Sequence, residues 1–393
     1  RHVPVWHEKT RQARRAGKLV VIGLIQEQHA DRCRLFAQWK GFDWPILHDP
    51  INRLGPRAVP IVVAVDEAGN VVDASLSTDE LASFLQRAPA KAAASIPSEI
   101  SEGRIVDQQA KTSGRAIDWI LAGDRQLLWG RTGKESEAIN RYQKAVELDQ
   151  DSAPGWFRLG AAFRARFDSP QSRRDDFANA VAAWERALEI DPNHYIYRRR
   201  IQQYGPRLSK PYPFYDWIDQ ARREIEARGD KPVTLRTEPV GAEIAEPSPT
   251  VQASVSNPSP PDPQGRISRD RQGLVQVDVV VVPGKVDVGD AVRVHLHFQP
   301  TTGAHWNNEV EPPKVWIETP KGWQVESPLL ELPQPLEPES SEPRVVDFEV
   351  HTGEPAGKNT VIQADTLYYV CEEEGGQCLY RRQDIDIPVR TNP

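Results

Sequence analysis

Short apolar runs alternate with polar stretches in the N-terminal part of the chain, and this order predicts an α/β domain. Residues 19–25 form a continuous apolar run typical of a buried parallel strand. A helix capped by Asp31 is expected as far as Trp39, because apolar residues recur there at helical spacing. A second strand is expected at residues 45–47, which completes a β-α-β unit. A hairpin of residues 61–65 and 71–72, joined by the turn 66–70, and a last helix at residues 78–85 follow.

The middle of the chain has the dense apolar periodicity of packed helices. Residues 138–149 are echoed by residues 180–192, and between them Trp156 opens a W-x-x-L-G sequence. This order resembles tetratricopeptide repeats, although the two copies lie further apart than the standard period of about 34 residues. The resemblance implies a surface for protein partners. Roughly two repeats rarely stand alone, so we expect the helices to pack against a neighbouring domain or partner.

Towards the C-terminus a segment rich in proline precedes a region of alternating polarity. Residues 231–270 are rich in Pro, Ser, Thr and Glu, and we expect them to form an extended linker. Residues 292–298 and 345–350 alternate as half-buried strands do. Several such strands between turns predict an all-β, immunoglobulin-like sandwich.

Together these patterns predict a multidomain fold of the α/β + α + β class. The predicted parts are, in order, a thioredoxin-like domain that lacks its N-terminal portion (residues 1–87), a linker (88–114) and a tetratricopeptide-like helical domain (115–230). A Pro-rich linker (231–270) and an immunoglobulin-like β-domain (271–393) follow.

Composition narrows the function classes. The 393 residues carry a net charge of −7, which argues against a nucleic-acid partner because counterion release requires a basic surface. No apolar run reaches the roughly 18 residues of a membrane span. H-E-x-x-H and phosphate-binding glycine loops are absent from the sequence, so we predict neither a metal nor another cofactor. His295 and His297 share one face of a strand and could together bind a metal. Arg293 lies on the same face, so we interpret that face as the solvated side of the strand.

Three motifs in the first domain resemble the thioredoxin fold, in the branch of TlpA-like and peroxiredoxin-like proteins. They are residues 43–49 (DWPILHD), 58–60 (AVP) and 66–72 (DEAGNVV). The resemblance implies that Pro60 follows a cis peptide bond and that Val59 and Pro60 line a substrate groove beside a C-x-x-C motif. We expect that motif upstream of Arg1, since residues 1–4 resemble those that follow it. A thioredoxin-like domain without these cysteines is the alternative.

The chain has three cysteines, Cys33, Cys371 and Cys378. A hairpin-like excursion between two predicted strands brings Cys371 and Cys378 together, as a disulfide requires. Redox exchange, a structural disulfide and two free thiols all remain open for this pair. Cys33 lies in the first turn of a predicted helix, where the macrodipole lowers a thiol pKa, but isolated cysteines are more often inert packing residues.

The surroundings of this pair resemble the N-terminal immunoglobulin-like domain of the disulfide reductase DsbD. Residues 368–371 (YYVC), 378–380 (CLY) and 385–389 (IDIPV) carry the resemblance. It implies that Cys371 and Cys378 form a redox-active pair that exchanges electrons with thioredoxin-like partners. The spacing of the two cysteines is one residue longer than is usual in that family, and the proline that usually follows the second cysteine is missing.

These features favour a bacterial thiol–disulfide exchange protein whose substrates are thiol or disulfide proteins, in an extracytoplasmic or periplasmic compartment. The alternative is a non-enzymatic scaffold that binds a protein partner through a degenerate thioredoxin-like domain and the helical repeats. A C-x-x-C motif before Arg1 would separate the two hypotheses.

Overall fold

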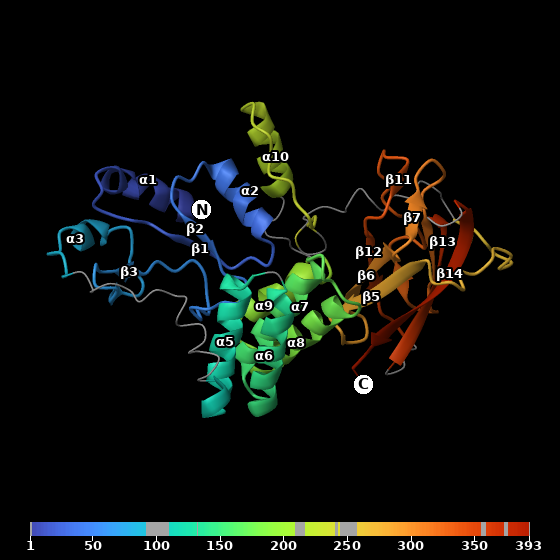
Figure 1. The fold of residues 1–393 in the computed structure, drawn as a ribbon, viewed down its shortest axis with the longest axis horizontal. Coiled ribbons are helices and arrows are strands. Elements are labelled where there is room, and N and C mark those ends of the chain that lie inside the picture. Colours follow the sequence, from blue (N-terminus) through green and yellow to red (C-terminus); the bar gives the residue numbers. More distant parts are fainter. Residues whose placement is uncertain are drawn as a thin grey trace. The chain divides into compact units, whose positions relative to one another are not determined.

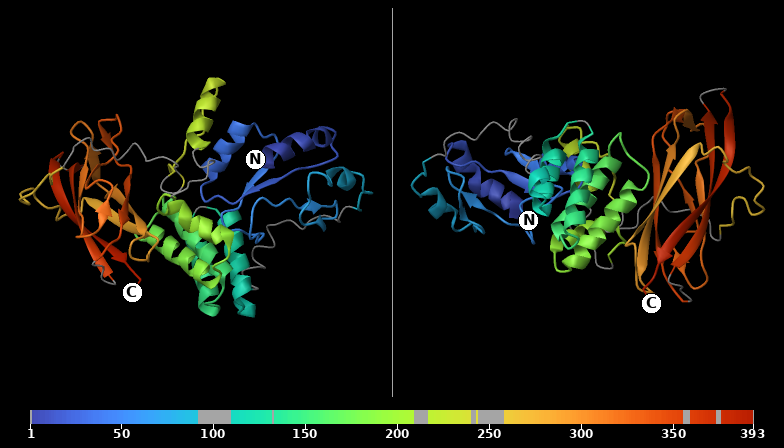
Figure 2. Two further views of the ribbon diagram at one scale, coloured as in Figure 1. Left: turned by 180° about the vertical axis from the view of Figure 1, so that it is seen from behind. Right: turned by 60° about the horizontal axis from the view of Figure 1, so that its bottom comes forward.

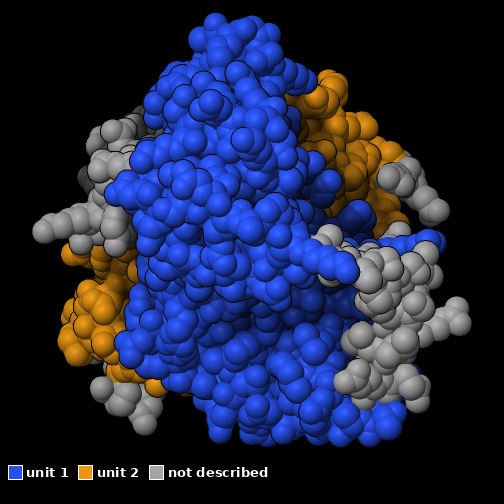
Figure 3. Space-filling view, turned by 90° about the vertical axis from the view of Figure 1, so that its left-hand side faces the viewer, with its two compact units in different colours: residues 1–173, 186–199, 216–238 blue, residues 174–185, 200–215, 239–393 orange. Residues whose placement is uncertain are grey.

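The computed structural model describes residues 2–91, 110–131, 133–208, 217–239, 243, 258–354, 359–372 and 376–392. In this part the chain has a mixed α/β multidomain fold with a mostly antiparallel β region at the C-terminus (Figure 1). Two compact units, coloured in Figure 3, divide it: residues 1–173, 186–199 and 216–238 form unit 1, and residues 174–185, 200–215 and 239–393 form unit 2. The division passes through helices α8 (Asp176–Ile190) and α9 (Tyr195–Tyr204).

Unit 1 begins with helix α1 (His2–Arg15) and a pair of parallel strands, β1 (Gly23–Ile25) and β2 (Ile46–His48). Helix α2 (Ala30–Lys40) connects the two strands, since parallel neighbours require a crossover. Gly41 ends α2 with a φ of 61°, and the cap donates N–H bonds to the carbonyls of Ala37 and Gln38.

A short hairpin follows, made of β3 (Ala64–Val65) and β4 (Val71–Asp73), as the turn sequence predicts. The Asp66 carboxylate accepts backbone N–H bonds from Ala68 and Asn70, at 2.9 and 2.8 Å, and fixes the turn. The peptide bond between Val59 and Pro60 is cis. The hairpin and the β1–β2 pair are two separate two-stranded sheets, and helix α3 (Leu81–Leu85) follows the hairpin.

Three expectations for this part differ from the structure. Of the predicted strand 61–65, only Ala64 and Val65 form one. Within the apolar run 19–25 only β1 is a strand, because only its residues have a hydrogen-bonded neighbour in β2. His29, not Asp31, occupies the N-cap of α2. Asp31 lies inside the first turn, buried, and its carboxylate accepts the backbone N–H of Arg236 at 2.7 Å.

The central helices of unit 1 are α5 (Ala116–Trp129), α6 (Lys134–Leu148) and α7 (Ala153–Phe167), and each packs against the next. Ser152 caps α7 by accepting the N–H of Gly155. The predicted helical stretches 138–149, 156–163 and 180–192 fall on α6, α7 and α8, and each helix begins three or four residues before the predicted stretch.

Helix α10 (Trp217–Ala227) packs against α2 (Figures 1 and 2). The rings of Trp39 and Trp217 stack with centroids 5.9 Å apart, and Leu235 is buried in the same cluster. The segment predicted as an extended linker therefore has a packed beginning. Its end is also bonded, since Asp270 and Arg382 pair through the backbone in unit 2. Residues 240–242 and 244–257 of this linker, and residues 92–109 of the first one, lie outside the described residues.

Unit 2 contains two antiparallel sheets. The larger has the order β10 (Leu329–Glu331), β8 (Lys314–Glu318), β13 (Asn359–Glu372), β7 (Ala304–Asn307) and β11 (Glu339–Ser340), with β14 (Cys378–Arg390) on the other side of β13. The smaller has the order β5 (Val275–Val282), β6 (Ala291–Pro300), β12 (Arg344–His351) and β9 (Gln324–Val325).

One hydrophobic core joins the inner faces of these sheets. Strand β6 contributes its even positions, from Val292 to Phe298, and β13 contributes Tyr368 and Val370. Alternate residues of a strand point to opposite faces, so the alternating apolar pattern of the sequence selects the inner face. The neighbouring odd positions of β13, among them Cys371, therefore lie on the outer face of the larger sheet.

The prediction that Arg293, His295 and His297 face solvent is wrong for the first two, which are buried. In unit 2, residues 174–185 and 200–207 cover this face of the smaller sheet. His295 Nε2 lies 2.8 Å from the carbonyl oxygen of Tyr204, and the Phe177 ring lies beside both histidines, at 5.4 and 5.7 Å between ring centroids. Contacts from a remote part of the sequence cause this burial.

Candidate functional site

Cys371 and Cys378 form a disulfide at the end of the β13–β14 hairpin. The two residues are direct partners in the strand register, and their Cα atoms are 3.9 Å apart. The Glu372 N–H donates to the carbonyl of Gln377, one step closer to the turn. The bridge therefore ties the last directly paired positions before residues 373–375, which lie outside the described residues.

The two sulfur-bearing residues differ in exposure. Cys371 is 2% exposed, in the middle of three strands, whereas Cys378 on β14 is exposed. Thiolate attack on a disulfide depends on which sulfur can be reached. An incoming thiolate therefore meets Cys378, and Cys371 is placed as the leaving group.

Two stacked tyrosines flank the disulfide on the outer face. Tyr369 and Tyr380 are the next pair on this face, with ring centroids 4.3 Å apart and an interplanar angle of 25°. Burial raises the pKa of Tyr380 to about 12, with Glu311 and Tyr369 acting in the same direction. Tyr380 is therefore uncharged at neutral pH, and the stacked rings of Tyr369 and Tyr380 lie along one side of the disulfide.

On its other side, Cys371 faces a histidine that was not among the predicted site residues. The register of β7 with β13 pairs His305 directly with Cys371. His305 Nε2 lies 3.6 Å from Oε1 of Glu339 on β11. The row Cys378, Cys371, His305 crosses the adjacent strands β14, β13 and β7, which Figure 1 labels together with β11. On β11, Glu339 is paired with Asn307, two residues from His305 along β7.

The sequence did contain a signal for this arrangement. His305 belongs to a stretch rich in aromatic and polar residues, G-A-H-W-N-N-E, at positions 303–309. Its neighbour Trp306 is fully buried in the core, which places His305 on the opposite face. Only the strand register brings it next to Cys371.

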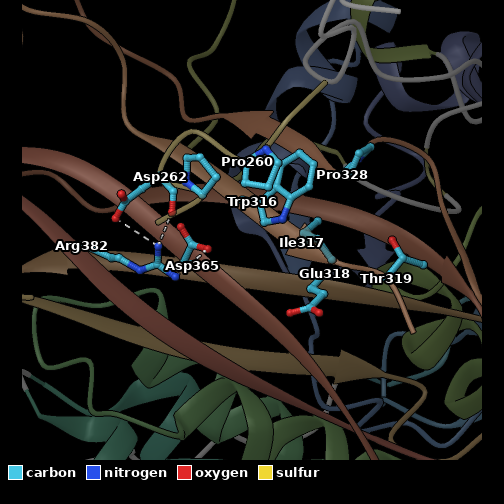
Figure 4. A pocket seen from close by; sticks show the side chains of 10 residues that line it. Pro260, Asp262, Trp316, Ile317, Glu318, Thr319, Pro328, Asp365 and Arg382 are labelled. Carbon is cyan, nitrogen blue, oxygen red and sulfur yellow. Dashed lines mark hydrogen bonds and ion pairs between the residues drawn. The ribbon is translucent and has the colours of Figure 1, made fainter. Parts of the chain in front are cut away.

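The outer face of the same sheet also carries a cavity of about 460 Å³ (Figure 4). Its lining includes Trp316 of β8, Asp365 of β13, Arg382 of β14 and, from the segment that enters unit 2, Asp262. Arg382 bonds to Asp262 and Asp365, at 3.2 and 3.1 Å, and also to Asp384 at 2.9 Å. Three carboxylates therefore compensate its charge, and the cluster holds residues 260–267 against the sheet.

In unit 1, the residues predicted to line a substrate groove, Val59 and Pro60, are both exposed. Cys33 is buried in α2, with its sulfur 3.9 Å from the carbonyl of His29. A redox thiol requires access by its partner. Burial therefore argues against the redox role considered for Cys33.

The described residues hold neither a metal-binding group nor a membrane-spanning helix. Within these ranges no group of three or more His, Cys, Asp or Glu side chains is arranged to hold a metal ion. Nor is any described helix both long and apolar enough to cross a membrane.

No protein-family model matches this chain, and no curated protein matches it. Among solved structures, AvmM, which catalyses macrocyclization in alchivemycin A biosynthesis, is 10% identical over 30% of this chain and 90% of its own, with a TM-score of 0.18. Spo0M, a sporulation control protein from Bacillus subtilis, is 12% identical over 31% of this chain and 51% of its own, with a TM-score of 0.17. The alkylpurine DNA glycosylase AlkC of Pseudomonas fluorescens, bound to DNA with an abasic site analog, is 9% identical over 75% of this chain and 83% of its own, with a TM-score of 0.15. Scores this low carry no inference about fold or function.

Proposed function

We propose that this protein exchanges electrons with dithiol or disulfide proteins through the Cys371–Cys378 bridge. The observation that carries the proposal is the asymmetry of the bridge, which joins an exposed cysteine to a buried one. An exposed sulfur accepts attack by a thiolate, and a buried partner stays in place to re-form the bridge. Closing so short a loop stabilises a fold by only about 2 kcal/mol, so stability gives a modest reason for the bridge.

As part of this proposal we assign fold families to the parts of the chain. The two antiparallel sheets of unit 2 correspond to an immunoglobulin-like domain of the DsbD N-terminal type. Helices α6, α7 and α8 correspond to tetratricopeptide-type hairpins that bind a protein partner. The β1–β2 pair and the β3–β4 hairpin correspond to a thioredoxin-like domain, in which Val59 and Pro60 line the groove for a protein substrate. A disulfide of this kind persists in an extracytoplasmic compartment, which we infer as the location.

Mixed-disulfide trapping tests the exchange. In Cys371→Ser the exposed Cys378 keeps its thiol, and we expect it to form a stable mixed disulfide with oxidised glutathione. The matched variant Cys378→Ser retains only the buried thiol and should form far less. Equal yields from the two variants would remove the asymmetry on which the proposal rests.

A redox titration of the wild-type chain separates exchange from a structural role. A redox-active bridge should be reduced reversibly across a series of glutathione buffers, as judged by alkylation and mass spectrometry. A structural bridge should remain oxidised in all of them. That result would contradict the proposed exchange.

A specific observation in unit 1 favours the second candidate, a protein-binding scaffold. Leu24 and Leu47 are direct partners in the β1–β2 pair, and both are exposed. Val65 and Val71 of the hairpin are paired and exposed in the same way. Contiguous exposed apolar residues mark surfaces that bind proteins. A scaffold of this kind would retain partner binding in a Cys371→Ser, Cys378→Ser double variant, whereas the exchange protein would lose its activity.

A further inference from the structure

His305 shares a face of the sheet with the disulfide. Directly opposed residues on neighbouring antiparallel strands have Cβ atoms about 5 Å apart and point to the same side. Cys371 is opposed by Cys378 on β14 and by His305 on β7. The buried half of the bridge is thus flanked by a sulfur on one side and by an imidazole on the other.

The side chain of Glu372 lies on the other face of the sheet from the imidazole of His305. Glu372 follows Cys371 and is opposed by Ala304, a residue of the inner core. Its side chain therefore leaves the strand on the face opposite to Cys371. The His305 side chain is 16% exposed. When the imidazole is protonated, it forms an ion pair with the Glu339 carboxylate through Nε2.

We propose that His305 stabilises the Cys371 thiolate that is released when an incoming thiolate attacks Cys378, an inference that rests on the exchange proposed above. An imidazole changes its charge close to neutral pH, so it can present a positive charge to a thiolate or give it a proton. A leaving thiol departs faster when its anion is stabilised. His305 thereby speeds the departure of Cys371, the sulfur that leaves when Cys378 is attacked.

The exchange proceeds in two balanced steps. A thiolate of a donor dithiol attacks the sulfur of Cys378; the new S–S bond joins donor and Cys378, and the electron pair of the broken bond goes to Cys371. The second donor thiol, once deprotonated, attacks the donor sulfur of this mixed disulfide, and Cys378 leaves as a thiolate. The donor ends as a disulfide, two electrons have reached the protein, and the protons of the donor thiols end on the protein cysteines.

The rate of reduction of the full chain by dithiothreitol tests the role of His305. The reaction is quenched by alkylation at intervals between pH 5.5 and pH 8, and each rate constant is divided by the fraction of reagent present as thiolate. At pH 5.5 this corrected constant should be about tenfold higher in the wild type than in His305→Gln, which offers neither a positive charge nor a proton to the leaving thiolate. In His305→Gln it should be low at every pH.

Two further variants keep the test independent of folding defects. His305→Lys retains a positive charge over this range, so its corrected constant should be high and independent of pH. His351→Gln replaces an exposed histidine of β12 and should reproduce the wild-type profile. A purely structural role of His305 would not make the Lys variant fast.

The outcomes distinguish the inference from the function on which it rests. If the wild-type bridge is not reduced at any pH, both the exchange and the role of His305 are overturned. If the wild type is reduced but His305→Gln follows the same pH profile, only the role of His305 is overturned.

Discussion

The Nδ1 atom of His29 lies 3.3 Å from Oδ2 of Asp168, which joins the start of α2 to the end of α7 within unit 1. Burial lowers the pKa of the imidazole, and the positive charges of Arg32 and Arg164 act in the same direction, although Asp168 opposes them. Burial alone would raise the pKa of the Asp168 carboxyl, but Arg164 and His29 outweigh it and hold this pKa well below its ordinary value.

Both shifts predict that unit 1 loses stability in acid. An ordinary histidine binds a proton below about pH 6.5, so the unfolded chain binds it before the folded chain does. Stability should therefore fall as the pH decreases through about 6.5, by at most about 1.4 kcal/mol per pH unit for this one group. Asp168 adds a second loss below about pH 4, where unfolded carboxylates take up protons.

Hydrogen exchange of α2 and α7 at pH 7.5 and pH 5.5 measures the first loss. The difference in protection between the two pH values should shrink in His29→Asn, which keeps a favourable N-cap but does not titrate. His351→Asn, in unit 2, should leave it unchanged. If the protection of α2 and α7 in the wild type were the same at pH 7.5 and pH 5.5, the buried imidazole would not govern this contact.

Gly123 of α5 is expected to tolerate no side chain. A Cβ atom at this position would overlap the ring of Tyr142 on α6. The ring is fully buried, and its hydroxyl donates to Asp124 at 3.0 Å, so it has no room to shift. Alanine gains up to about 1 kcal/mol in helix propensity, but overpacking costs about 1–3 kcal/mol. Gly123→Ala should therefore lower the free energy of unfolding of unit 1.

Urea denaturation followed by helical circular dichroism measures this change. Leu121→Ala alters an exposed position of the same helix and should change stability little. If Gly123→Ala were as stable as the wild type, the close approach of α5 and α6 at this point would be disproved.

Local patterns in the sequence predicted most helices, because their apolar faces repeat over many residues. Residues 138–149 and 180–192 are examples, and both coincide with helices. The apolar run 19–25 was less informative. Val20 and Ile22 are exposed and unpaired within the described sheets, since a strand also requires a partner, which composition does not identify.

The candidate site shows the same limit. Cys371 and Cys378 are near in sequence, so a hairpin sufficed to predict that they lie together. His305 lies far from Cys371 in sequence, and only the β7–β13 register opposes the two. The burial of His295 likewise depends on Phe177 and Tyr204, which belong to helices that precede the sheets.

The buried charges of β6 and β12 predict a strongly destabilising substitution in unit 2. Arg293 bonds to Glu349 at 2.8 Å and to Asp347, and burial lowers the pKa of Arg293 to about 10. Glu349 also accepts the backbone N–H of Arg207 at 2.7 Å. Glu349→Gln removes the charge from this buried pair, and breaking such pairs costs about 3–5 kcal/mol.

The free energy of unfolding, obtained from hydrogen exchange of β6 and β12, measures this cost. Glu326→Gln is the matched control, because Glu326 pairs with Arg207 near the surface and should cost about 1 kcal/mol or less. Equal costs for Glu349→Gln and Glu326→Gln would contradict the assigned burial.

The last prediction concerns the packing of α10 and the residues after it on α2. Leu235 is buried with Leu35 and Ile225, and Trp39 Nε1 donates to Glu224 of α10 at 2.6 Å. Leu235→Ser leaves a cavity lined by apolar side chains and should cost about 2–4 kcal/mol of this local packing. The hydrogen bonds of this segment also go to α2, such as those of Arg228 and Arg236 with Trp39 and Asp31, so we expect local release from α2 rather than unfolding of unit 1.

Local release has a distinct signature. Hydrogen exchange of residues 217–238 should accelerate in Leu235→Ser while α5 and α6 keep their protection, since those helices share no contact with Leu235 in its cluster. Thr234→Ser, at the exposed neighbouring position, should match the wild type. Uniform loss of protection across unit 1 would instead mean that this segment is an integral part of its core, and unchanged protection would mean that Leu235 does not hold it.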